Sequence, residues 1–215
     1  MTLDDPTTPT VVLFDLGGVL IDWDPRHLYR KLIADTATME WFLAEVCSPE
    51  WNAEQDAGRS FADAVAEATA RHPEHAVWIR AFAERWPETI AGDIAESVAV
   101  LEALAFRGVP LFALTNWSAE TFHVARSRFG WLRHFHDILV SGEVGMKKPD
   151  AAIFRLMLDR IGVEPGTVLF IDDSAANVTA SQALGLQTIH CTSPVMITGD
   201  PRIRRLLGDP VATAA

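Results

Sequence analysis

Polar residues capable of chemistry come at four places in the chain, three of them directly after an apolar run. These runs, VVLF, PLFAL and VLFI, are typical of buried strands, and the fourth place is a loop after DILVS. Taken alone, an acid after such a run is as often a turn or capping residue. Acids, a hydroxyl, an amide and ammonium groups together predict a reaction centre instead. In chain order these residues are Asp15, Thr115 with Asn116, Lys147 with Lys148, and Asp172 with Asp173.

The residue types in this set favour phosphoryl transfer. Acids without histidine or cysteine suit a hard cation such as Mg²⁺, which takes oxygen ligands. A lysine beside them compensates charge and can hold a phosphate. A carboxylate can attack phosphorus to form an aspartyl-phosphate, while a hydroxyl and backbone N–H groups hold the phosphoryl oxygens. The set therefore predicts metal-assisted transfer of a phosphoryl group to water.

An α/β sheet is the element that would bring these residues together. Helical stretches separate the apolar runs, and this alternation predicts a parallel, doubly wound sheet. The carboxyl ends of its strands gather on one edge, where ligands bind in such folds. The expected strands are residues 10–15, 109–114, 137–141, 167–171 and 186–191.

A helical insert interrupts the expected sheet after its first strand. Cap-and-proline pairs at Asp24-Pro25 and Ser48-Pro49 start helices, and the segment up to Gly92 is expected to be helical throughout. We therefore predict a Rossmann-like core of residues 1–22 and 91–215 and a helical cap of residues 23–90. Packing within the helices is favoured over a pocket for the tryptophans of this segment. They are Trp23, Trp41, Trp51, Trp78 and Trp86.

The composition limits the classes of molecule that the protein is expected to bind. The formal net charge of −11 opposes binding to nucleic acids or anionic membranes, since both need basic patches. The first ten residues lack the features of a signal peptide, and no apolar run reaches the length of a membrane span. Two distant cysteines, Cys47 and Cys191, favour a reducing compartment. We expect a cytoplasmic protein that is a monomer or a homodimer.

Four short motifs resemble those of the haloacid dehalogenase superfamily. They are FDLGGVLIDWD, LTN, GMKKPD and FIDDSAAN, in the family's order and over nearly the whole chain. The bacterial α-glucose-1-phosphate phosphatases are the most similar subgroup, because they also have Asp-Leu-Gly in the first motif. The resemblance implies a Rossmann-like core, with a helical cap between the first and second motifs. It also implies a Mg²⁺-dependent phosphatase acting on a small phosphorylated metabolite such as a sugar phosphate.

The resemblance also implies roles around the phosphoryl group. Asp15 would be the nucleophile, and Thr115 and Asn116 would bind the phosphoryl oxygens. Ser174 and Asn177 match the tail of the fourth motif and would support the site. For that last pair, a helix cap and a local turn are equally good interpretations.

A second group of roles concerns charge. Asp15, Asp173 and the backbone carbonyl of Gly17 would bind Mg²⁺, and Asp172 would be a further acid of the metal site. Lys148, directly before a proline, would neutralise Asp15 and the phosphate.

One position departs from the family pattern. Most phosphatases of the superfamily have a second Asp two residues after the nucleophile, which protonates the leaving oxygen and then activates water. Gly17 occupies that position here. Either Asp22 or Asp24 substitutes, or water suffices for a good leaving group. The competing interpretations are a turn residue for Asp22 and a helix cap for Asp24.

The departure leaves two alternatives to a phosphatase. Metal-independent 2-haloacid dehalogenases of this fold also lack the second Asp, but they typically have serine in the second motif and a Ser/Asn-rich fourth motif. Thr115 and the adjacent Asp172 and Asp173 favour the phosphatase, because two such acids would repel a substrate carboxylate. The other alternative is a non-catalytic binding protein of the same fold.

The cap is expected to close over the site and to select the substrate. Trp23, Trp51 and Arg26 are the candidate pocket residues, because they lie near the cap hinge or within the insert.

Overall fold

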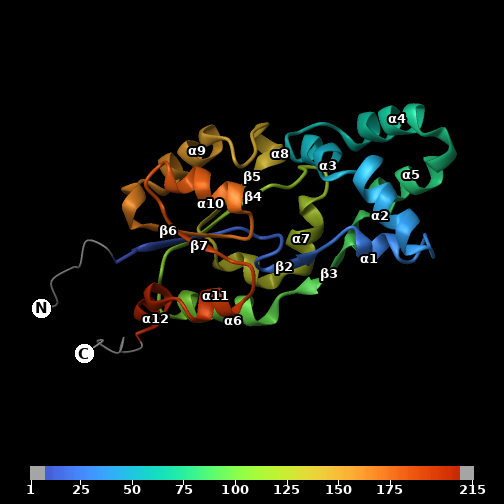
Figure 1. Ribbon diagram of the computed structural model, residues 1–215. Coiled ribbons are helices and arrows are strands. Elements are labelled where there is room, and N and C mark those ends of the chain that lie inside the picture. Colours follow the sequence, from blue (N-terminus) through green and yellow to red (C-terminus); the bar gives the residue numbers. More distant parts are fainter. Residues whose placement is uncertain (1–7, 209–215) are drawn as a thin grey trace, which may run out of the picture.

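Five short strands form one parallel sheet in the computed structural model, which describes residues 8–208 (Figure 1). Their spatial order is β5-β4-β1-β6-β7, and every neighbouring pair is parallel. The chain moves outward from β1 in one direction and later returns to its other side, so the connections reverse beside β1. Ligands bind at such a reversal in open α/β sheets. In chain order the strands are β1 (Val11–Phe14), β4 (Leu111–Thr115), β5 (Asp137–Val140), β6 (Val168–Asp172) and β7 (Gln187–His190).

Helices cover both faces of the sheet, which confirms the doubly wound α/β architecture. Val12 and Phe14 of β1 point into one apolar layer, and Val11 and Leu13 point into the other. All four side chains are buried, as expected for a central strand of a parallel sheet. The layer around Val11 and Leu13 contains α9 (Ala151–Ile161) and α10 (Ala175–Gln182). The opposite layer contains α6 (Ala95–Phe106), α7 (Phe122–Arg128), α11 (Val195–Thr198) and α12 (Pro201–Leu207).

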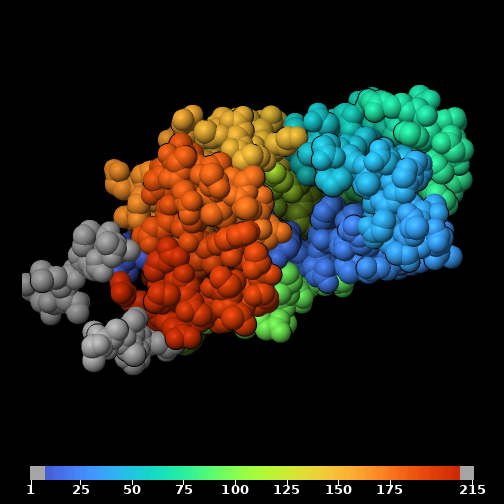
Figure 2. All heavy atoms as spheres, viewed as in Figure 1, coloured from blue at the N-terminus to red at the C-terminus, as the bar shows by residue number. Residues whose placement is uncertain are grey.

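The chain between β1 and α6 builds a mostly helical lobe beyond the carboxyl end of β1. Figure 2 shows this lobe, coloured blue to green, at one end of the molecule. Two short strands, β2 (Ile21–Trp23) and β3 (Ile90–Asp93), pair antiparallel where the lobe joins the core. The helices between them are α1 (Arg26–Tyr29), α2 (Thr36–Glu45), α3 (Pro49–Asp56), α4 (Phe61–Arg71) and α5 (Ala76–Glu84), with 3₁₀ turns at Pro73–His75 and Trp86–Thr89.

The expectation that the insert is helical throughout was therefore wrong at its end, where β3 forms. A four-residue strand is too short to show a periodic pattern, and its partner β2 lies on the other side of the insert in sequence. The cap boundaries at residues 23 and 90 fall on this strand pair and remain a prediction.

Serine caps start two helices of the insert, and the cap at Ser48 was predicted. The Ser48 hydroxyl accepts from the Trp51 N–H over 3.2 Å, and the Ser60 hydroxyl accepts from the Asp63 N–H over 3.0 Å. Trp51 then packs edge-on against Phe82, with 5.1 Å between ring centroids. Both rings belong to the apolar layer that continues from the sheet into the insert, so one hydrophobic core joins the two parts.

Three short helices and turns complete the described chain. They are α8 (Ser141–Val144) and the 3₁₀ segments Gly130–His134 and Pro165–Thr167. No helix within residues 8–208 is long and apolar enough to cross a bilayer.

Candidate active site

Asp15 comes directly after β1, and its carboxylate is almost completely buried at the sheet edge. The Leu16 backbone N–H donates to Asp15 Oδ1 over 2.7 Å, and Lys148 Nζ lies 2.9 Å from the same oxygen. Within residues 8–208, no hydrogen bond reaches the other oxygen, Oδ2. One oxygen is thus held in place while the other is free to attack an electrophile.

Lys148 is held between two acids. Its side chain is fully buried, and Nζ lies 2.7 Å from Asp172 Oδ2 as well as 2.9 Å from Asp15. Burial by itself lowers the pKa of Lys148, but Asp15 and Asp172 outweigh it and the net shift is upward. The ammonium therefore stays charged and neutralises part of the surrounding negative charge.

Asp172 uses its oxygens to fix the site. Besides Lys148, it accepts from the Ser174 backbone N–H over 2.8 Å and from Asn177 Nδ2 over 3.0 and 3.1 Å. It is fully buried. Ser174 precedes α10 as expected of a cap, although its side chain makes no capping bond. Ser174 and Asn177 thus support Asp172, which in turn positions Lys148.

Asp173 stands beside this group with its side chain toward solvent. One carboxylate oxygen from each of Asp15, Asp172 and Asp173 lies within 4.8 Å of the others. Gly18 makes room for Asp173: a Cβ at Gly18, which has φ of 71°, would lie 2.2 Å from Asp173 Oδ2. A glycine is required there for this carboxylate to approach the loop after β1.

The balance of charge in this cluster fits a divalent cation. Burial raises the pKa of Asp15 to about 8, with Lys148 opposing the rise and Asp172 and Asp173 adding to it. Burial, followed by the charge of Asp172, also raises the pKa of Asp173. Three acids against one lysine leave excess negative charge, and their oxygen atoms are the donors that Mg²⁺ prefers.

Residues of the second motif, LTN, hold the loop that contains Lys148. Thr115 is the buried last residue of β4. The Asn116 side chain donates to the Lys148 carbonyl over 2.9 Å and accepts from the Lys148 N–H over 2.8 Å. Asn116 therefore positions Lys148, a role that its sequence position did not reveal. Binding of phosphoryl oxygens by Thr115 and Asn116 remains a prediction.

The structure does not bring Asp22 or Asp24 to this cluster. Asp22 is half exposed on β2 and lies 2.9 Å from His27 Nε2. Asp24 Oδ1 accepts from the Arg26 backbone N–H over 2.8 Å, which is the capping arrangement expected as the alternative. Arg26 itself is bound to Glu40 of α2.

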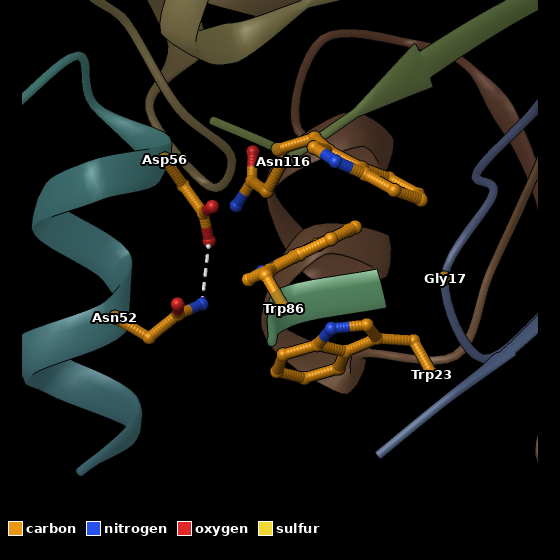
Figure 3. A pocket seen from close by; sticks show the side chains of 7 residues that line it. Gly17, Trp23, Asn52, Asp56, Trp86 and Asn116 are labelled. Atoms are coloured by element: carbon orange, nitrogen blue, oxygen red, sulfur yellow. Dashed lines mark hydrogen bonds between the residues drawn. The ribbon is translucent and has the colours of Figure 1, made fainter. Parts of the chain in front are cut away.

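A small pocket lies where the insert meets the sheet edge, and Figure 3 shows its side chains. Its cavity volume is about 60 Å³. Three indole rings line it, and those of Trp86 and Trp117 lie 5.2 Å apart between centroids. The lining residues are Gly17, Trp23, Asn52, Asp56, Trp86, Asn116 and Trp117.

The pocket corrects part of the sequence interpretation. Trp23 lines it as expected, but Trp51 packs inside the insert and Arg26 pairs with Glu40, so neither reaches the pocket. The sequence interpretation also missed Asp56 at the end of α3. No motif marks that residue, because its position depends on how the insert docks on the core.

Comparisons with known proteins agree with this geometry. A hydrolase family model, described as haloacid dehalogenase-like hydrolase, matches residues 9–185. The curated relative "Sesquiterpene phosphatase astK" of Aspergillus oryzae is 27% identical over 202 residues, which is 94% of this chain and 98% of that protein.

Two solved structures share the fold. A HAD family enzyme from Bacteroides thetaiotaomicron, in complex with magnesium and inorganic phosphate, matches with a TM-score of 0.63 and 25% identity, over 84% of this chain and 92% of that one. The L-2-haloacid dehalogenase of Xanthobacter autotrophicus, with chloropropionic acid covalently bound, matches with a TM-score of 0.63 and 15% identity, over 95% and 85% of the two chains. The second match shows the fold alone.

Proposed function

The chain belongs to the haloacid dehalogenase-like hydrolase family, and we propose that it is a Mg²⁺-dependent phosphatase acting through an aspartyl-phosphate. One observation carries this proposal. Asp15 has one carboxylate oxygen held by Lys148 and a backbone N–H, and the other is free beside two further acids. That arrangement presents a nucleophile in a place where a dianionic phosphoryl group needs added positive charge.

The chain's own residues supply the following roles in the proposed reaction. Asp15 Oδ2 attacks phosphorus, and the Lys148 ammonium stabilises charge on the phosphoryl oxygens. Asp172 keeps that ammonium in place through a 2.7 Å contact. Asp15, Asp173 and the Gly17 carbonyl would hold Mg²⁺, which when bound supplies Lewis-acid polarisation of the phosphoryl group.

The proposed substrate is a small phosphate ester. The Aspergillus oryzae relative is named a sesquiterpene phosphatase, and indole rings suit both an apolar chain and the face of a sugar. A sugar phosphate, as for the α-glucose-1-phosphate phosphatases, therefore remains one candidate. The cavity of about 60 Å³ is far smaller than the roughly 300 Å³ at the low end for ligand pockets. The indole side chains around the cavity must therefore shift to admit a leaving group.

The alternatives fit the site less well. A haloacid dehalogenase would have to place a substrate carboxylate beside Asp172 and Asp173, and like charges repel there. A binding protein without turnover would not need a nucleophile with a free oxygen. A cytoplasmic location and a monomeric or homodimeric state remain predictions.

Hydrolysis of p-nitrophenyl phosphate tests the proposal. The purified chain is assayed with Mg²⁺, with EDTA, and as the Asp15→Asn variant, which keeps the size of the side chain. We expect turnover in Mg²⁺ alone, and a loss of at least about a thousandfold in the other two conditions. Halide release from 2-chloropropionate without metal, in the absence of phosphate release, would instead establish the dehalogenase.

A further inference from the structure

We propose that Asp56, at the end of α3, is the general acid and base of this active site. The inference rests on the proposed phosphatase function and names the group that moves the proton. It assigns to the insert a catalytic task in addition to covering the site.

The first argument is the place of Asp56 in the pocket. Among the residues that line the pocket in the described chain, Asp56 is the acid, and Gly17 lies on the opposite wall (Figure 3). A Cβ at Gly17 would meet no atom within 4 Å, so the space beside the nucleophile loop is open. Because Gly17 and Asp56 line the same cavity, a leaving group that enters it would lie between them.

The second argument is that the end of α3 is fixed to the core. The Ser141 hydroxyl donates to the Asp56 carbonyl over 2.6 Å, and Lys147 Nζ donates to the Ala53 carbonyl over 3.0 Å. Gly58, which follows α3 beside the Gly142 carbonyl of α8, has φ of 103°, a backbone conformation that favours glycine. Asp56 is therefore held over the sheet edge by backbone contacts, as a residue that transfers a proton must be.

The third argument is the environment of the carboxyl group. The Asn52 side chain donates to Asp56 Oδ2 over 3.2 Å. Burial raises the pKa of Asp56 to about 7, although Lys147, Lys148 and the Ser118 backbone N–H oppose the rise. A carboxyl group with this pKa can give up and regain a proton near neutral pH.

The proton follows the phosphoryl group through both halves of the reaction. First, Asp15 Oδ2 bonds to phosphorus, the ester P–O bond breaks, and its electron pair goes to the leaving oxygen, which takes the Asp56 proton. The alcohol departs, leaving Asp56 as a carboxylate. Next, Asp56 takes a proton from water as the water oxygen bonds to phosphorus. The bond to Asp15 breaks, inorganic phosphate leaves, and both acids return to their starting states.

Leaving-group dependence separates this role from a structural one. The holoprotein in Mg²⁺ is assayed with p-nitrophenyl, phenyl and benzyl phosphate, which place similar rings in the pocket. The p-nitrophenolate departs without a proton, whereas the benzyl alkoxide needs one. For Asp56→Asn we expect kcat/KM to fall at least about a hundredfold with benzyl phosphate and to stay within about threefold with p-nitrophenyl phosphate.

Glu54→Gln is the matched control. It removes one negative charge from the same helix at an exposed position outside the pocket, and we expect all three rates to be unchanged. A parallel fall of kcat/KM for Asp56→Asn with all three esters would overturn the proposal, as would an unchanged kcat/KM with benzyl phosphate. Failure of the wild-type chain to hydrolyse any ester would instead reject the proposed phosphatase function.

Discussion

The sheet edge and the insert differ in how firmly they hold charge. We call Asp15, Lys148, Asp172 and Asp173 the carboxylate floor, and the lining residues of the insert, including Asp56 and Trp86, the insert wall. In the floor, Lys148 lies 2.9 and 2.7 Å from two acids. In the insert wall, the Asp56 carboxylate has a neutral partner, Asn52, at 3.2 Å. The floor is built to keep its charges, and the insert wall is built so that one acid can change its charge.

Replacing the buried lysine should have the largest effect on stability. Lys148→Met leaves Asp15 and Asp172 without their counter-ion, and we expect the free energy of unfolding to fall by about 3–5 kcal/mol. Activity should be lost as well. Lys147→Met removes a partly exposed cation of the same loop and should cost less than about 1 kcal/mol. Urea unfolding in EDTA measures both, and equal losses would contradict the distinction between the buried and the exposed lysine.

An acid introduced at position 17, beside the floor, should restore part of the activity that Asp56→Asn loses. Gly17→Asp places a carboxylate in open space beside Asp15, at a residue without positive φ. In the Asp56→Asn background we expect it to raise kcat/KM for benzyl phosphate at least about tenfold. Gly17→Asn in the same background is the matched control, because it fills the same space without an acid. Equal rates for the two double variants would contradict a shared role of the two positions.

The pH dependence of kcat/KM should follow the protonation of Asp56 in the insert wall. Asp56 must carry a proton to donate it, and it loses that proton as pH rises through about 7. The charged groups facing it are Lys147 and Lys148, while Glu54 and Glu143 of the adjoining helices are exposed. We expect kcat/KM for benzyl phosphate to fall about tenfold per pH unit above that value.

The Asp56→Asn variant supplies the control for this profile. The descending limb should be absent from the variant, and it should also be absent from the wild-type profile with p-nitrophenyl phosphate. A limb that persists in the variant would assign the titration to another group.

The smallest effects are expected at the acids that the structure leaves outside the pocket. Asp22→Asn weakens the contact to His27, and Asp24→Asn keeps a side-chain oxygen that can still accept from the Arg26 N–H. We expect both to retain kcat/KM for benzyl phosphate within about threefold, and Asp24→Asn to change stability by less than about 0.5 kcal/mol, because asparagine caps a helix about as well as aspartate does. A hundredfold loss of kcat/KM in either variant would instead assign the proton transfer to that residue, in the segment after β1.

The acids of the floor could be predicted from the sequence because each stands at the end of a strand. Once the apolar runs are taken as neighbouring parallel strands, Asp15, Asp172 and Asp173 must meet at one edge, whatever the rest of the chain does. The strand positions and the serine caps of the insert rest on equally local signals. The fold class was therefore confirmed.

The insert wall could not be predicted in this way. Asp56 of the insert meets Trp117 of the core, which is far from it in sequence, and nothing local distinguishes either residue from surface or core residues. The two hydrogen bonds between Asn116 and Lys148 depend on the path of a loop, and the β2–β3 pair is too short to show a pattern. These features come from docking between segments, which hydrophobic periodicity does not report.

Trapping the covalent intermediate tests the central claim most directly. Asp56→Asn should form the aspartyl-phosphate with p-nitrophenyl phosphate but hydrolyse it slowly, so the intermediate accumulates. Acid quenching followed by borohydride, which reduces an acyl phosphate to an alcohol, should convert residue 15 to homoserine. Mass spectrometry of the peptide should show this change in proportion to a burst of p-nitrophenol. An unmodified Asp15 during turnover, or reduction at another acid, would contradict the account.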